Sequence, residues 1–425
     1  MRVKKSPTLA TRRGVSVVLI SICLVSLVGM LAISLEGGLL LTERRKAQST
    51  ADAAAMAGAT DLYYHHYVNY GVDAGGSAEQ SALTTAYENS YKNDGVETKV
   101  EVFIPPRPNS GPYAGKASYV EVIVTYYHTR GFSAIFGANK VEVKARSVAV
   151  GKPAAAEVGI LVLDPLAKSA FNAGGGAKIT VNKVPVQVNS TSSEGSIAGG
   201  GGSATAPLFN LTGYYTTSGG GTFNGPIRSP APPMPDPLRN LPVPDKSKLT
   251  TQSRNKKQYT SGSVELEPGV YVGGINASST ASITLKPGVY YMDSGGFSFT
   301  GQGSLRGDGV MIYTAPGNGN ADGVDLAASG TVKMTPQTTG IYKGVLLYQD
   351  RTSTVAASVS GGSNMDLTGT FYFANAQLNV TGNSNFINVG SQYVSRTLNV
   401  QGTTTLYVDW NPDGVGQTRL ITIVE

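Results

Sequence analysis

The sequence predicts a single-pass membrane protein with an N-terminal transmembrane helix, a small α+β head and an all-β, right-handed β-solenoid. Three observations indicate this fold class. Residues 15–35 form an uninterrupted apolar run, helical and alternating patterns follow it, and short motifs recur at about 20 residues in the rest of the chain.

The apolar run has the length of a membrane span. A helix needs about 20 apolar residues to cross a bilayer, and residues 15–35 contain no charge. The rival interpretation is a secretory signal peptide, but its apolar segment has only about 7–15 residues, and residues 39–41 extend the run further. We therefore expect a transmembrane helix over residues 15–41.

The basic residues around the span predict its orientation. They are more numerous in residues 1–14, which include Arg12 and Arg13, than directly after the span. Because cytoplasmic flanks carry the excess of Lys and Arg, residues 1–14 are expected to be a cytoplasmic segment and the C-terminal domain to be extracytoplasmic.

The composition is typical of an exported structural chain. The 425 residues include 53 glycines, and only 15% are charged. The single cysteine, Cys23, lies inside the apolar run, which excludes a disulfide framework and a Cys-based zinc site. The formal net charge of +6 comes partly from residues beside the span, where anionic lipid attracts them. We therefore expect the lipid bilayer as a partner, no cofactor and no nucleic acid.

Residues 42–152 are predicted to form the α+β head. Residues 47–59 are almost all small and good helix formers, with Asp52 as their only charge, so another element can pack closely against them. A second helix is expected at about residues 78–91. Alternating apolar residues then predict strands of an antiparallel sheet, at residues 99–104, 119–127 and 140–150.

These N-terminal residues carry a family resemblance. Arg12-Arg13-Gly14, the apolar run, Glu36 near its outer end and the alanine-rich helix around Asp52 resemble the N-terminal region of TadE/TadG-like proteins of the tight-adherence (Flp) pilus assembly system. Residues 131–137 also fit this pattern. The resemblance implies a pilin-like head, pilus assembly subunits as partners, and contacts with membrane or partner through Arg12, Arg13, Gly14, Glu36 and Asp52.

Two departures from related patterns narrow what the resemblance implies. A processed prepilin carries Glu five residues after its cleavage-site Gly, whereas the fifth residue after Gly14 is Leu19. We therefore expect no pilin-type processing. The run that ends at Asp164 begins like the metal motif of a von Willebrand A module but continues Pro165-Leu166-Ala167, so no such metal site is expected.

The repeats predict a solenoid over residues 153–425. The motif Leu-x-Pro-Gly-Val-Tyr begins at Leu266 and again at Leu285, and Leu-Asn-Val-x-Gly begins at Leu378 and again at Leu398. A near-constant period with short strands and Gly/Asn turns is typical of coils that stack in parallel. The alternative is a β-sandwich, which needs two-residue hairpin turns that are sparse in this sequence.

A Pro-rich loop at residues 226–244 interrupts the repeats. Proline cannot donate a hydrogen bond to a sheet, so we expect this loop to be extended and to lie along the solenoid.

The sequence contains few candidates for catalysis or metal binding. Asp322 and Asp325 lie in a Gly/Asn-rich loop whose oxygens suit calcium, although the terminal Glu of a known calcium loop is missing. Neighbouring histidines on a helix diverge by about 100°, so His65 and His66 do not share a ligand. The remaining carboxylates near basic residues, which we interpret as turn-forming or solvated, are Asp308 with Arg306 and Asp350 with Arg351.

These observations favour a non-enzymatic envelope protein, structural or adhesive and associated with Flp/Tad-type pilus assembly. The alternative is a membrane-tethered β-helix that binds or cleaves surface polysaccharide, with tyrosines for stacking. Tyrosine at repeat positions is more often strand packing; the candidates are Tyr271, Tyr290, Tyr313, Tyr342 and Tyr348.

Overall fold

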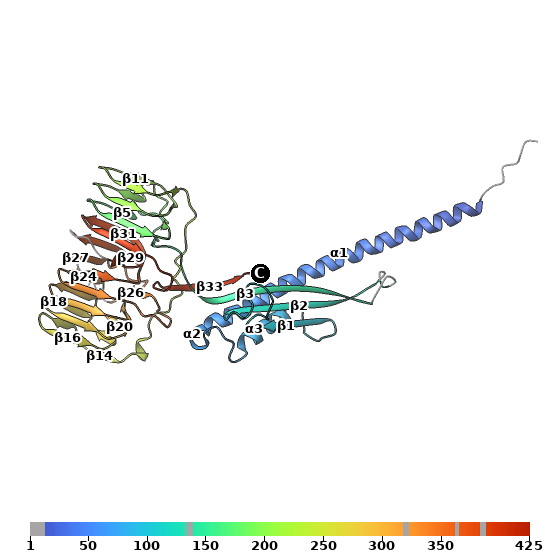
Figure 1. The fold of residues 1–425 in the computed structure, drawn as a ribbon, viewed down its shortest axis with the longest axis horizontal. Coiled ribbons are helices and arrows are strands. Elements are labelled where there is room, and N and C mark those ends of the chain that lie inside the picture. The colour runs from blue at the N-terminus through green and yellow to red at the C-terminus, as the bar shows by residue number, and fades with distance from the viewer. Residues whose placement is uncertain (1–12, 132–133, 135–138, 318–322, 362–364, 383–387) are drawn as a thin grey trace, which may run out of the picture. The chain divides into compact units, whose positions relative to one another are not determined.

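The computed structural model describes residues 13–131, 134, 139–317, 323–361, 365–382 and 388–425 (Figure 1). The chain forms two compact units, the head (Met1–Pro153 with Leu420–Glu425) and the solenoid (Ala154–Arg419). The chain leaves the head after Pro153 and returns to it at Leu420. The solenoid is therefore inserted into the head, whereas the predicted solenoid range of 153–425 included these last residues.

The transmembrane and alanine-rich segments form one continuous helix, α1 (Arg13–Tyr64). Apart from the half-buried Leu40, its large apolar side chains from Val17 to Leu41 are between 51% and 70% exposed. By length and composition this helix can cross a membrane. The short helix α2 (His66–Asn69) and the longer α3 (Ser77–Glu88) follow it.

The alanine-rich half of α1 packs inside the head. Ala51 and Ala55 are fully buried, in a cluster with alanines of α3 and with Val120 of the sheet. Gly151 of the same sheet allows a close approach to α1, because a Cβ at this position would overlap the carbonyl group of Ala59. The small residues of α1 therefore serve the fold of their own chain.

The head sheet has four strands in the order β1–β2–β3–β33. The pairs β1–β2 and β2–β3 are antiparallel, as predicted. The fourth strand comes from the C-terminal residues, and the amide of Val148 donates to the carbonyl oxygen of Glu425 over 2.7 Å. The strands are β1 (Thr98–Phe103), β2 (Tyr119–Thr129), β3 (Lys140–Ala155) and β33 (Gln417–Ile423).

The solenoid consists of coils whose strands stack in parallel, as the repeats predict. Leu266 pairs with Leu285, and Leu378 pairs with Leu398, so equivalent repeat positions lie directly above one another. The first coils contain β4 (Ile160–Val162), β5 (Phe171–Ala173), β6 (Lys178–Asn182), β7 (Val186–Val188), β8 (Ser196–Ala198), β9 (Ser203–Thr205), β10 (Phe209–Leu211), β11 (Tyr215–Thr217), β12 (Thr222–Asn224) and β13 (Ile227–Arg228).

The later coils follow a short 3-10 helix, η2 (Lys246–Lys248). They contain β14 (Thr251–Ser253), β15 (Lys257–Tyr259), β16 (Ser263–Leu266), β17 (Gly269–Val272), β18 (Ile275–Ser279), β19 (Ser282–Leu285), β20 (Gly288–Asp293), β21 (Phe297–Gly301), β22 (Ser304–Gly307), β23 (Val310–Thr314), β24 (Val324–Ala328), β25 (Thr331–Met334), β26 (Val345–Gln349), β27 (Ala357–Gly361), β28 (Met365–Leu367), β29 (Thr370–Gly382), β30 (Asn388–Val389), β31 (Gln392–Gly402) and β32 (Thr405–Asp409).

The coils do not stack in the order of the sequence. The last long strand, β31, pairs in parallel with β4 and β5, and β32 pairs with β6. The coils that begin at β14 therefore precede those that begin at β4 along the stack. Figure 1 shows the result, with β5 beside β31 in the middle of the solenoid.

Residues 229–250, which we call the strap, join the two ends of this stack. They connect β13, which pairs with β10 at one end, to β14, which pairs with β17 at the other. The strap lies along the solenoid, as predicted for the Pro-rich loop, although Ile227 and Arg228 at the start of that loop still form β13. Leu238 and Leu241 of the strap pack into one buried cluster with outward-facing tyrosines of successive coils.

Those tyrosines form a continuous column. Tyr291, Tyr313, Tyr348 and Tyr372 are register partners on β20, β23, β26 and β29. Their neighbouring ring centroids are 4.9, 5.0 and 5.2 Å apart. The strap covers an aromatic surface that stacking of the coils creates.

Candidate functional site

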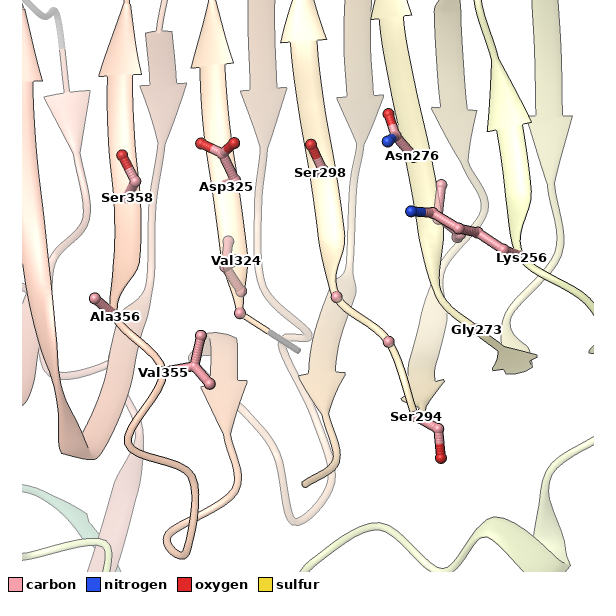
Figure 2. A pocket seen from close by; sticks show the side chains of 14 residues that line it. Lys256, Gly273, Asn276, Ser294, Ser298, Val324, Asp325, Val355, Ala356 and Ser358 are labelled. Atoms are coloured by element: carbon pink, nitrogen blue, oxygen red, sulfur yellow. The ribbon is translucent and has the colours of Figure 1, made fainter. Parts of the chain in front are cut away.

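The candidate site is a polar groove on the outer face of the solenoid, away from the strap. It crosses the coils that contain β15, β18, β21, β24 and β27, with a volume of about 720 Å³. Figure 2 shows its side chains on successive parallel strands. The lining residues are Lys256, Gly273, Ile275, Asn276, Ser294, Gly295, Gly296, Ser298, Gly323, Val324, Asp325, Val355, Ala356 and Ser358.

Four polar side chains form a row along the groove. Asn276 pairs with Ser298, Ser298 with Asp325, and Asp325 with Ser358, so the four residues occupy one register position. Since parallel neighbours in a sheet lie about 4.8 Å apart, the row is about 14 Å long. The residues on either side of this position point inward and are buried, as at Phe297 and Phe299.

Small residues hollow out one side of the groove where the chain turns into these strands. Gly274 has φ +76°, and a Cβ there would overlap the carbonyl oxygen of Gly296. A Cβ at Gly295 would overlap the backbone of Gly273. Glycine is therefore required for these turns to stack, and the missing side chains leave the row open to solvent.

Asp325 is the groove's only carboxylate among its described lining residues. Burial raises the pKa of Asp325. Lys256 lines one end of the groove and is exposed. Groups of three or more His, Cys, Asp or Glu side chains suited to a metal ion are absent from the residues that the structure describes. Asp322, the second residue of the predicted calcium pair, lies outside the described residues.

The other acidic candidates have structural partners. Asp308 lies in the turn after β22 and accepts a hydrogen bond from Thr335 over 3.2 Å. Asp350 accepts one from the Tyr313 hydroxyl over 2.6 Å. Burial would raise the pKa of Asp350, but hydrogen bonds from Thr352 and Tyr313 outweigh it and lower that pKa. Arg351 donates to the carbonyl oxygens of the strap.

The histidines do not converge on a common ligand. His65 Nδ1 lies 3.1 Å from a carboxylate oxygen of Asp61, whereas His66 Nδ1 lies 3.4 Å from the Ser118 hydroxyl. Burial, and then the charge of Lys152, lower the pKa of His66. His128 lies on β2.

The residues predicted to contact membrane or partner lie along α1 where they are described. Arg13 and Gly14 are in its first turn, and Arg12 lies outside the described residues. Glu36 is only 8% exposed. Asp52 accepts a hydrogen bond from Gln48, whose side chain also donates to the carbonyl oxygen of Arg146 on β3.

The tyrosines considered for stacking on sugars face the interior or the strap. Tyr271, Tyr290, Tyr313 and Tyr348 are at most 2% exposed, so the packing interpretation is confirmed for them. The groove instead contains Asn276, Ser298 and Ser358, which sequence reasoning missed. The apolar-polar-apolar pattern of β21 and β27 was visible, but not that their middle residues align.

Comparison with known protein families finds a match for the N-terminal part of the chain. No curated protein and no solved structure matches it. Residues 14–61, which form most of α1, match a family model described as putative Flp pilus-assembly TadE/G-like. The N-terminal helix of this chain is therefore similar to that of the TadE/G-like family, and a β-solenoid follows it.

Proposed function

We propose that the protein is a non-enzymatic, single-span envelope protein that works with a Flp/Tad-type pilus assembly system. Residues 1–14 lie in the cytoplasm, α1 spans the bilayer, and the solenoid is displayed outside the membrane as a structural or adhesive module. The observation that carries this proposal is the TadE/G-like match over residues 14–61, which coincides with an exposed apolar helix.

Several features support a structural role. The solenoid interior is apolar, and the carboxylates Asp164 and Asp350 are held by hydrogen bonds from Arg396 and Tyr313. Acid/base cleavage of a glycosidic bond ordinarily uses two carboxylates, whereas the groove's described lining holds Asp325 alone. The alternative function was binding or cleavage of a surface polysaccharide. The groove favours binding over cleavage.

Pilus assembly and surface attachment test the proposed association. A strain without this protein is expected to lose one or both, and the full chain is expected to restore them. A matched pair of complementing chains carries Asp52→Asn on α1 or Asp366→Asn on β28, where the Asp366 side chain is 37% exposed. If assembly and attachment in the deleted strain equal those of the parent, the association is wrong.

Thiol labelling tests the orientation, because Cys23 lies in the span and the chain has no other cysteine. We would introduce Lys168→Cys, whose side chain is 76% exposed, or Lys5→Cys. The outer layer of the cells is permeabilised, and the membrane that α1 spans is left intact. A membrane-impermeant maleimide is then expected to label only the Lys168→Cys chain. Labelling of Lys5→Cys alone would reverse the proposed orientation.

A further inference from the structure

We propose that the groove binds a neutral polysaccharide whose chain runs along the solenoid axis, across β18, β21, β24 and β27. The proposal rests on the outward display of the solenoid for its role at the cell surface. Its four hydrogen-bonding positions are Asn276, Ser298, Asp325 and Ser358, which form the row described above.

The same register position behaves differently inside and outside the groove. On the next coils it is occupied by Asn379, Asn399 and Asn172. Asn399 donates to Asn379 over 3.1 Å, and Asn172 donates to Asn399 over 2.9 Å, so these amides satisfy one another. Within the described part of the chain, the four groove side chains make no hydrogen bonds of this kind.

This contrast indicates that a ligand completes the row. Stacked side chains at one register position readily pair along a solenoid, as the asparagines show. In the groove, Ser and Asp replace Asn, and two hydroxyls and a carboxylate stand beside one amide. The result is a line of donors and acceptors spaced about 4.8 Å apart, which faces a hollow instead of closing on itself.

The backbone of the groove excludes an added peptide strand. Peptides that extend a sheet bind at its edge, where amide and carbonyl groups are unpaired. Here β21 and β24 are paired with neighbouring coils on both sides. The groove also offers few apolar contacts for peptide side chains. Val324 is buried, glycine forms much of the wall, and the accessible apolar lining is Val355 and Ala356. Hydroxyl groups of a sugar chain match the exposed side chains.

The charges favour a neutral polymer. Asp325 lies inside the row, between Ser298 and Ser358, and burial raises its pKa. An acidic polymer would place carboxylates against Asp325. A neutral sugar instead donates hydroxyl protons to Asp325, while Lys256 at the end of the groove donates to a sugar oxygen.

The test measures binding to the full chain in lipid nanodiscs by calorimetry. The neutral probes are cello-, malto- and N-acetylated chito-oligosaccharides. Polygalacturonate serves as the acidic polymer and casein as the unfolded polypeptide. At least one neutral oligosaccharide is expected to bind. Ser298→Gln and Ser358→Gln, which fill the groove with a longer polar side chain, are expected to weaken that binding about tenfold or more.

Thr284→Gln is the matched control, because Thr284 is exposed on β19, outside the groove. The thermal midpoint of each variant is measured, so that a misfolded chain is recognised. Asp325→Asn adds a groove variant whose side chain keeps its size. The proposal is overturned if no neutral oligosaccharide binds, if the groove variants bind as the control does, or if polygalacturonate or casein binds better. Since pilus assembly is not measured, this result is independent of the proposed association.

Discussion

Asp164, two residues after the end of β4, forms an ion pair with Arg396 of β31, with 2.8 Å between Oδ2 and Nε. Asp164 also accepts hydrogen bonds from the amides of Leu166 and Ala167. Its side chain is 8% exposed, whereas that of Arg396 is 49% exposed. The pair therefore closes the junction at which the last coils meet the first.

Removal of this pair is expected to destabilise the solenoid. Arg396→Met leaves the Asp164 carboxylate buried without its cation, and we expect a loss of about 1–2 kcal/mol in the free energy of unfolding. The only tryptophan, Trp410, donates to the carbonyl oxygen of Ala156 beside the junction, so its fluorescence in denaturant reports the change. Lys168→Met is the control, and it should cost less than about 0.5 kcal/mol because the Lys168–Glu194 pair is exposed. Equal effects of the two variants would contradict this prediction.

The strap is expected to loosen when its hydrogen bond to the tyrosine column is removed. The Tyr372 hydroxyl donates to Asp236 of the strap over 2.6 Å and accepts from Arg351. Tyr372→Phe leaves the half-buried Asp236 carboxylate without this donor, which costs about 1.5–3 kcal/mol. Trypsin should then cleave the strap faster at Arg239, which is exposed. Tyr215→Phe, at a residue 43% exposed, should leave the cleavage rate unchanged.

The head is expected to lose stability in acid through Glu121. Burial would raise the pKa of Glu121, but hydrogen bonds from Arg107 and Arg146 outweigh it and lower the pKa from 4.5 to about 2. Because the folded state holds the ionised form more strongly, this stabilisation is fully present above about pH 4.5 and is lost as the pH falls towards 2. A shift of this size corresponds to about 3 kcal/mol.

Glu121→Gln tests that pH dependence. At pH 7 the variant should be less stable than the parent, and the difference should shrink between pH 4.5 and 2, as measured by hydrogen exchange of β2. Glu142→Gln is a control, since Glu142 is 61% exposed beside Lys144. A stability difference that is constant with pH would mean that packing, and not the charge of Glu121, stabilises the head.

The strand β33 is expected to be required for the head. Ile421 packs against the head core, whereas Ile423 is 42% exposed. Ile421→Asp places a charge against apolar side chains, and we expect a loss of about 2 kcal/mol or more. Hydrogen exchange at Val148, whose amide donates to Glu425, should accelerate in this variant and not in Ile423→Asp. Protection that is equal in the two variants would show that β33 contributes little.

Local patterns predicted most elements of this protein because local residues determine them. The apolar run, the small residues around Ala51, and the matching repeats at Leu266 and Leu285 each appear within one segment of sequence. The order of the coils depends on contacts between distant segments. Ile160-Leu161-Val162 has no feature that distinguishes Tyr393-Val394-Ser395 as its partner among many similar apolar strands.

The sequence patterns did not predict the groove, for a related reason. Turns of different length separate Asn276, Ser298, Asp325 and Ser358, so the row has no constant period in the sequence. Parallel pairing brings the four residues to one register position only after the coils have formed. The sequence paired Asp325 with Asp322 as an acidic candidate. In the structure its neighbours on the adjacent strands are Ser298 and Ser358.

The position of β4 in the middle of the stack limits how this protein is made. A chain that emerges from its N-terminus presents β4, β5 and β6 early, yet the strands that cover them, β31 and β32, emerge last. Until then one side of the first coils is an open sheet edge, which is prone to pair with other chains. Growth from one end, coil by coil, therefore cannot complete this solenoid. Biogenesis must keep the early coils from aggregating until β31 and β32 have been made and have paired with them.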